Sequence, residues 1–364
     1  MRNIFVKEEV NTARQIEFDI AKVLCIILMI FIHCFEQFGC FSDCTSHPLY
    51  YAIVIVMDAL FCASVFVGSM GLGMAYSKAQ NPEDIMRRGV RLFIAGYALN
   101  ILRSTIDVVF SSFGITSWND TLIYIFESDI LQFAGLSFIL FGFLKKIKCS
   151  DLMVFIIALG MSAVGSFVRF IDLGNVHINQ LVGLFIGTFD PVLEEETACF
   201  PLFNWFILVV ICYLYAKKLR HCNNKDRYYS MTLLLSGAIV GAYMLYAIPN
   251  RYGMLSNTLL YFYNFSTYNV LILFSGIIFL TSVYHFVLKL ISERLINKIF
   301  LTSSNLTPIY FVQWIIIGNM YSIFEYLELE SIHLSTIIFI AVCVIVISVF
   351  FGNRCPKSIK KIFS

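Results

Sequence analysis

The chain has 364 residues and a formal net charge of +2; 59% of its residues are hydrophobic and only 14% are charged. Soluble domains average roughly 45–50% apolar and 25% charged residues, so the composition excludes an ordinary soluble protein and indicates a polytopic membrane protein. The net charge is uninformative, and we expect no nucleic-acid partner. The 11 cysteines form no CxxC pair and no cysteine–histidine spacing suited to zinc, so we expect no metal.

The first apolar run carries three ionisable residues, Asp19, Lys22 and His33. Ionisable groups inside a membrane helix are costly unless they are paired or line a polar cavity, so each is a candidate functional residue. The eleven-residue separation of Lys22 and His33 places them on one helix face, about 16 Å apart along the axis. Asp19 precedes Lys22 by three residues, which predicts an ion pair. His47 and Asp58 follow shortly, and together these residues favour an enzyme over a passive membrane protein.

Apolar windows of about 20 residues are the unit that spans a bilayer. Ten such windows are predicted, and we expect an all-α protein in one transmembrane domain over residues 1–364. The windows cover 17–38, 50–75, 89–110, 123–144, 152–170, 200–216, 228–248, 268–288, 299–322 and 335–351.

Ten spans place both termini on the same side of the membrane, and the positive charges indicate which side. Of the 26 lysines and arginines, Lys22 and Arg103 lie inside spans, and only Arg169 and Arg251 fall on the side opposite the termini. Because cytoplasmic loops are rich in lysine and arginine, both termini are predicted to be cytoplasmic.

Two shorter segments need separate interpretation. The apolar stretch 177–189 is too short to cross the membrane, and we interpret it as a re-entrant or interfacial segment on the exterior side. The cluster Gly68, Gly71 and Gly73 ends the second window. Small residues at that spacing are typical of close helix packing; a glycine loop that binds phosphate is the alternative.

The third window begins with Arg87, Arg88 and Arg91. Arginine clusters suit phosphate groups, although the positive-inside rule explains the same residues. Arg103 and Asp107 lie one turn apart later in this window, which predicts an internal ion pair.

Taken in order, several stretches resemble the transmembrane acyltransferase superfamily, which includes the acyltransferase 3 proteins. Their first helix carries an arginine and, eleven positions later, a histidine; here these are Lys22 and His33. Further stretches resemble the branch of heparan-α-glucosaminide N-acetyltransferases. They are Ser46-His47-Pro to Asp58, the glycine-rich end of the second window, Arg87-Arg88-Gly-Val-Arg91, Ile130 to Ser137, Phe200 to Trp205, and Ser304 to Tyr310 followed by Gln313 where a histidine is common.

The resemblance implies an acyltransferase that uses acetyl-CoA as co-substrate. It implies His47 as the catalytic base, with His33 as the second candidate, and Asp58 is a candidate to orient a histidine, as in triad-type sites, or to be a buried partner of Arg103 or another cation. It also implies that Arg87, Arg88 and Arg91 hold coenzyme A. Residues expected to support the substrate or the structure are Asp19, Lys22, Gln132, Asn204, Trp205 and Asn305. Trp205, Tyr261, Tyr263 and Tyr268 are candidates to stack on a sugar, and an interfacial aromatic belt explains them equally well.

We therefore expect a multi-pass enzyme of a bacterial plasma membrane that moves an acyl group, expected to be acetyl, from cytoplasmic acyl-CoA to a hydroxyl or amine of an exterior sugar or glycan. Its partners are the donor, the acceptor and the lipid bilayer; a homodimer is left open. The alternative is a multipass transporter or flippase whose intramembrane charges line a pathway. The third hypothesis is a structural or sensory membrane protein that catalyses no reaction. Transporters often carry inverted repeats, and no repeat is visible here.

Overall fold

The structure is a computed structural model, and it describes residues 4–39, 62–77, 81–191, 195–250, 264–329 and 332–356. At 195 and 247–250 only the backbone is described. The predicted sites His47 and Asp58, and the tyrosines at 261 and 263, lie outside these residues.

The described chain is built almost entirely of helices, which confirms the all-α prediction. The α-helices are α1 (Ile16–Gly39), α3 (Ser64–Tyr76), α4 (Pro82–Arg103), α5 (Thr105–Ser112), α6 (Trp118–Phe126), α7 (Ile130–Lys146), α8 (Asp151–Phe167), α9 (Val176–Gly183), α10 (Leu202–Arg220), α11 (Lys225–Asn250), α12 (Val270–Val287), α13 (Glu293–Ser303), α14 (Leu306–Tyr326) and α15 (Leu334–Asn353). Short 3-10 turns, η4 (Thr267–Asn269) and η5 (Leu288–Leu290), flank α12. One small antiparallel pair, β1 (Phe189–Asp190) and β2 (Glu195–Glu196), follows α9.

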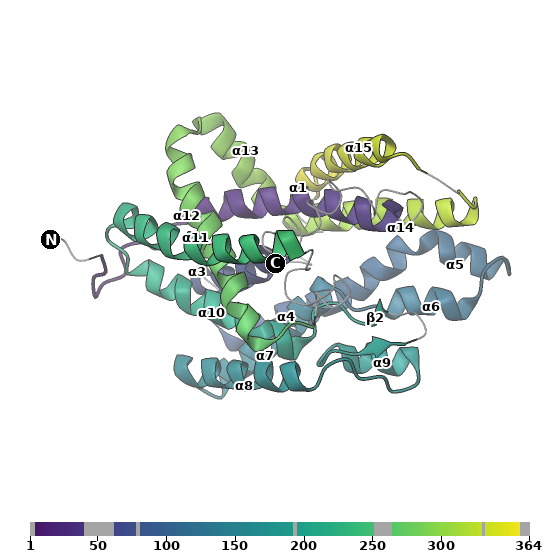
Figure 1. The fold of residues 1–364 in the computed structure, drawn as a ribbon, viewed down its shortest axis with the longest axis horizontal. Coiled ribbons are helices and arrows are strands. Elements are labelled where there is room, and N and C mark those ends of the chain that lie inside the picture. Colours follow the sequence, from purple (N-terminus) through teal and green to yellow (C-terminus); the bar gives the residue numbers. More distant parts are fainter. Residues whose placement is uncertain are drawn as a thin grey trace.

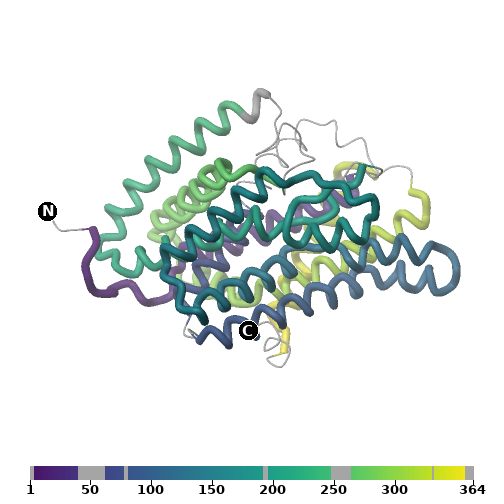
Figure 2. Tube along the Cα trace, turned by 90° about the horizontal axis from the view of Figure 1, so that it is seen from below, coloured from purple at the N-terminus to yellow at the C-terminus, as the bar shows by residue number. Residues whose placement is uncertain are grey.

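The long helices run side by side along the long axis of an elongated bundle (Figure 1). Figure 2 shows the same arrangement from a second direction, with α5, α6 and α9 gathered at one end of that axis. α1 contacts α3, α12, α13, α14 and α15, so the helix with the ionisable residues occupies the middle of the bundle.

Five described helices are long and apolar enough to cross a membrane on their own. They cover Ile16–Gly39, Leu202–Arg220, Lys225–Tyr246, Thr267–Leu290 and Leu334–Asn353. Two bent helix pairs raise the number to seven, and α3 and α8 are apolar but shorter. The chain is therefore an integral membrane protein, while the predicted ten spans and their orientation stay predictions.

Three predicted windows cross a break instead of forming one straight helix. α4 and α5 meet at 58° and α13 and α14 at 67°, while the window 123–144 is divided between α6 and α7. The second break precedes Pro308, whose ring nitrogen has no N–H to donate to the preceding turn. The third is fixed by Asp129 and Gln132, which cap the start of α7 reciprocally. Hydropathy windows detect apolar composition but not such caps.

Close helix packing is confirmed for two of the three clustered glycines. A Cβ atom at Gly71 would lie 2.0 Å from the carbonyl oxygen of Val209 on α10, and one at Gly68 would lie 2.6 Å from Ile277 on α12. Gly73 differs, because a Cβ atom there would meet no heavy atom within 4 Å. The space beside Gly73 belongs to one of the cavities of the candidate site.

Candidate active site

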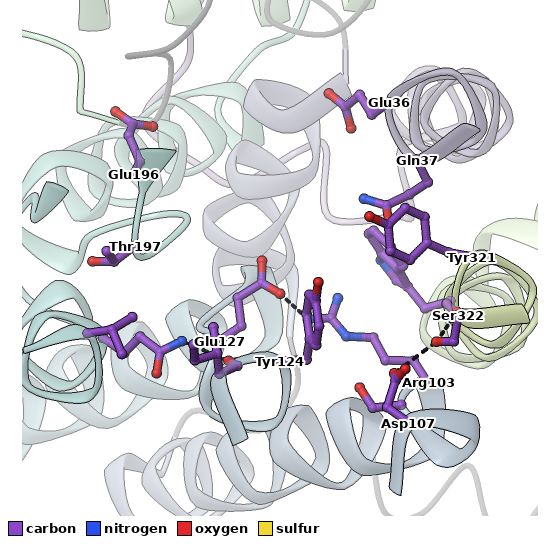
Figure 3. A pocket seen from close by; sticks show the side chains of 16 residues that line it. Glu36, Gln37, Arg103, Asp107, Tyr124, Glu127, Glu196, Thr197, Tyr321 and Ser322 are labelled. Atoms are coloured by element: carbon purple, nitrogen blue, oxygen red, sulfur yellow. Dashed lines mark hydrogen bonds and ion pairs between the residues drawn. The ribbon is translucent and has the colours of Figure 1, made fainter. Parts of the chain in front are cut away.

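A cavity of about 380 Å³ opens where the C-terminal parts of α1, α4 and α14 meet α6 and β2. Its walls carry four carboxylate residues, Glu36, Asp107, Glu127 and Glu196, and one cation, Arg103. We call it the carboxylate cavity. Figure 3 shows these side chains entering from separate elements around one open space. Hydroxyl and amine groups are the ligands that such walls favour, because carboxylates accept their hydrogen bonds.

Arg103 forms the main ion pair of this cavity. Its Nη2 atom lies 2.6 Å from Oε2 of Glu127, and its guanidinium carbon lies 4.9 Å from the centre of the Trp314 ring. The predicted pair between Arg103 and Asp107 is wrong. The helix breaks at Ser104 between them, and Asp107 instead accepts a hydrogen bond of 2.8 Å from the hydroxyl of Ser322.

A second cavity, of about 370 Å³, lies among the N-terminal parts of α1, α4 and α14, together with α3 and α7. Lys22 and Arg88 line it, and we call it the lysine–arginine cavity. The Arg88 guanidinium lies over the ring of Phe138 at 4.8 Å. Its buried Nε atom has no hydrogen-bond partner within the part of the chain that the structure describes. This cavity thus combines positive charge with an unused donor, the combination that an anionic ligand requires.

The other two arginines of the predicted cluster lie outside this cavity. Arg87 is exposed and lies 4.0 Å from Asp84, and Arg91 is exposed as well. Only Arg88 therefore points into the space where a phosphate group would be held.

The predicted pair between Asp19 and Lys22 is confirmed, at 3.8 Å. Asp19 also pairs with Arg14 at 2.5 Å and accepts a hydrogen bond of 2.6 Å from Ser303. Ser303 ends α13 and lines the lysine–arginine cavity. Asp19 therefore joins the start of α1 to the rim of that cavity.

His33 lies close to the wall of the carboxylate cavity. Its ring centre is 4.3 Å from that of Trp314, which lines the cavity, and its Nδ1 atom is 3.2 Å from Nε2 of Gln313. The Gln313 amide N–H donates to Nδ1, so a neutral His33 carries its proton on Nε2; with the amide turned over, Oε1 would accept from Nδ1–H and leave Nε2 free to accept a proton.

Tyr310 and Asp129 connect this region to the second cavity. The Tyr310 hydroxyl donates a hydrogen bond to the Asp129 carboxylate, which also accepts the backbone N–H of Ile130 at 2.6 Å. Ile130 lines the lysine–arginine cavity, while Tyr310 contacts Trp314 edge-on at 6.5 Å. We call His33, Gln313, Trp314, Tyr310 and Asp129 the central layer, because it contacts wall residues of both cavities.

Sequence reasoning missed several of these residues. Glu127 and Asp129 fall inside the predicted window 123–144. Like Asp19, they are ionisable residues in a predicted membrane segment, and by that criterion they were candidate functional residues. Tyr310 lies in a stretch that resembles the acyltransferases, but its pairing with Asp129 joins residues 181 positions apart and leaves no local signal. Gln132 bonds the Asp129 backbone N–H through its Oε1 atom at 3.2 Å, so it supports the central layer rather than facing a cavity.

Three further predicted residues are part of the packed interior. Trp205 is fully buried against Phe200 and Phe265, so its ring presents no face to a sugar. Asn204 donates a hydrogen bond of 2.8 Å to the carbonyl of Phe265, and Asn305 donates to the carbonyl of Leu301 at 2.7 Å. Tyr268 is 74% exposed and lines neither cavity.

The described residues include no group of three or more His, Cys, Asp or Glu placed to hold a metal ion. No described cysteine lines either cavity. Burial, together with the carboxylates of Glu127 and Asp129, raises the pKa of the Cys199 thiol well above its usual value. A neutral thiol is a poor nucleophile.

Comparison with known proteins identifies a family for the chain. The family model described as heparan-alpha-glucosaminide N-acetyltransferase, catalytic, matches residues 14–244. The match covers more than half of the chain and extends from the start of α1 into α11. No curated protein and no solved structure matches. The residues that α14 contributes to the central layer lie beyond the match. The chain belongs to the heparan-alpha-glucosaminide N-acetyltransferase catalytic family and is, by that membership, a transmembrane acetyltransferase.

Proposed function

We propose that the chain transfers an acetyl group from acetyl-CoA, held in the lysine–arginine cavity, to an amine or hydroxyl of a sugar or glycan held in the carboxylate cavity. The observation that carries this proposal is the charge division between two cavities of similar size, joined by a layer that contains a histidine. Family membership supports the reaction type. The division of charge supports the assignment of the two substrates.

The donor assignment rests on the chemistry of coenzyme A, a polyanion with a long, mostly apolar arm. Lys22 and Arg88 provide the cations for its phosphates. Apolar side chains such as Leu131 line the rest of the cavity and suit the arm.

The orientation follows from the positive-inside rule. The ten predicted spans put the termini, and with them the lysine–arginine cavity, on the cytoplasmic side where acyl-CoA is available. The carboxylate cavity then opens toward the exterior, near the segment 171–199, in a bacterial plasma membrane. The donor and the acceptor thus approach from opposite sides and meet at the central layer, in a single domain.

For the chemistry, we assign His33 as the general base. With the Gln313 Oε1 atom accepting from Nδ1–H, the Nε2 atom of His33 removes the proton of the attacking amine or hydroxyl and returns it to the sulfur of coenzyme A when the C–S bond breaks. His47, which the family resemblance favours, is the competing base; it and Asp58 lie outside the described residues. Because no described cysteine lines either cavity, we propose direct transfer instead of an acyl-cysteine intermediate.

A transporter remains the second candidate, because one observation favours it. Helices broken inside the membrane, as at α4–α5 and α13–α14, are common where transporters bind their substrates. The same two cavities would then be the two ends of a pathway.

One experiment separates the two functions. Purified protein in detergent is incubated with acetyl-CoA labelled in the acetyl group and a panel of amino sugars, neutral sugars and oligosaccharides. An acetyltransferase yields labelled sugar and free coenzyme A in equal amounts. A transporter yields neither in detergent, and only moves label across the membrane in vesicles. Absence of labelled product with every acceptor, from folded protein, would contradict the proposed function.

A further inference from the structure

Arg103 is a buried cation whose hydrogen-bonding capacity is largely unused. Its side chain is 8% exposed, and among the described residues only one hydrogen bond from it is formed, from Nη2 to Glu127. A guanidinium carries five N–H donors in a fixed plane. Arg103 lines the carboxylate cavity beside the Trp314 ring, so N–H groups that Glu127 does not use lie at the wall of this cavity.

The position of Arg103 relative to His33 is the second observation. Both groups lie against the same indole, the His33 ring at 4.3 Å and the Arg103 guanidinium at 4.9 Å from the centre of Trp314. The shared contact with Trp314 places His33 and Arg103 in the same part of the bundle. The cation on α1, Lys22, lies about 16 Å from His33 along the helix and lines the other cavity.

A structural role alone does not explain Arg103. The connection between α4 and the segment that follows α6 is already made by Asn100, whose side-chain amide donates to the carbonyls of Ile125 at 3.0 Å and Glu127 at 2.7 Å. The ion pair of Arg103 with Glu127 is thus one of several polar contacts between α4 and the segment that follows α6. Loss of Arg103 is expected to leave the fold intact.

We propose that Arg103 is a catalytic residue that stabilises the oxyanion of the acyl transfer. The inference rests on the proposed function. The acceptor atom attacks the thioester carbonyl carbon, and the C=O electron pair moves onto oxygen, where the unused N–H groups of Arg103 bind it. The C=O bond then re-forms, the C–S bond breaks, and the thiolate takes up the proton that His33 removed from the acceptor. Fixed donors in a site with little water are worth far more than in bulk solvent.

The test combines kinetics with chemical rescue of the purified full chain. Arg103→Ala is compared with His33→Ala and with Arg169→Ala, an arginine that lines neither cavity and donates to the carbonyl of Asn264. We expect Arg103→Ala to reduce kcat by about 10²–10³-fold, the usual effect of removing one oxyanion donor, with little change in KM for acetyl-CoA. Guanidinium ion at low, non-denaturing concentration should restore at least part of the rate in Arg103→Ala and none in His33→Ala.

Every outcome decides the proposal. A kcat near that of the wild type in Arg103→Ala overturns it, as does a folded, inactive variant that guanidinium does not rescue. If Arg103→Ala does not fold, Arg103→Lys decides: a lower kcat at unchanged KM supports the oxyanion role, and a higher KM at unchanged kcat overturns it. An inactive wild-type protein refutes the proposed function itself, a result distinct from all of these.

Discussion

The two cavities are nearly equal in volume, about 380 and 370 Å³, yet they differ in the sign of their charge. The same helices supply both. α1 contributes Lys22 to one and Glu36 to the other, and α4 contributes Arg88 to one and Arg103 to the other. One bundle thereby offers a site for a polyanion at one end and a site for hydroxyl or amine groups at the opposite end.

This difference has a consequence for specificity. The carboxylates of one cavity repel the phosphates of a donor, so each ligand is directed to its own end by attraction there and repulsion elsewhere. Under the proposed function, the reacting groups meet at the central layer.

Removal of His33 should have the largest effect. We expect His33→Ala to lower kcat by about 10²–10⁴-fold, the usual contribution of a general base. KM for acetyl-CoA should stay nearly unchanged, because His33 does not line the lysine–arginine cavity. His285→Ala is a matched control, since His285 pairs with Asp226 and stacks on Tyr229 away from both cavities. Full activity in His33→Ala, with loss in His47→Ala, would move the base to the loop between the first two predicted spans.

Removal of the cations that line the lysine–arginine cavity should have the second-largest effect. We expect Lys22→Ala with Arg88→Ala to weaken acetyl-CoA binding by about 10–100-fold, because two charge-assisted contacts to phosphate are lost. The matched double variant, Arg87→Ala with Arg91→Ala, removes the same number of charges from exposed positions. Isothermal titration with acetyl-CoA measures both. Equal loss in the two double variants would show that general positive charge, not the cavity, attracts the donor.

Filling the lysine–arginine cavity should have a smaller effect on donor binding. Gly73 lines it and has open space where a side chain would lie, so Gly73→Leu should reduce acetyl-CoA affinity by about tenfold through occupied volume alone. Gly241→Leu introduces the same side chain into open space on α11, outside both cavities, and should bind the donor normally. Unaltered binding in Gly73→Leu would place the donor elsewhere.

The smallest effect concerns stability rather than binding. Gly71→Ala should lower Tm by a few degrees, because overpacked interfaces cost about 1–3 kcal/mol and its Cβ atom would overlap the Val209 carbonyl. Thermal melting of Gly71→Ala and Gly73→Ala in one detergent makes the comparison. A lower Tm in Gly73→Ala alone would reverse the assignment of packing and cavity glycines.

The sequence predicted the helical membrane class, the ion pair of Asp19 with Lys22, and the family. These follow from composition, from helix periodicity and from ordered motifs, all of which are local along the chain. The pair of Arg103 with Glu127 and the bond from Tyr310 to Asp129 were missed because they join distant helices. Burial is equally non-local, and for that reason Trp205 was a candidate sugar contact although its ring is enclosed.

The candidate site was predicted only in part for the same reason. Three arginines at the start of α4 are alike in sequence, and only the packing of α4 against α7 turns Arg88 inward while Arg87 and Arg91 face out. Broken helices were also invisible, since a window average does not detect the cap at Asp129 or the proline after the start of α14.

We propose that the donor and the acceptor enter from opposite sides of the membrane and react at the central layer. The most direct measurement uses proteoliposomes with a known orientation of the protein. Labelled acetyl-CoA is supplied on the side of the termini and an acceptor sugar is enclosed on the other side. We predict labelled sugar on the acceptor side, and no product when both substrates are confined to the acceptor side. Product formed in the latter arrangement, or only when both substrates share the side of the termini, would contradict the account.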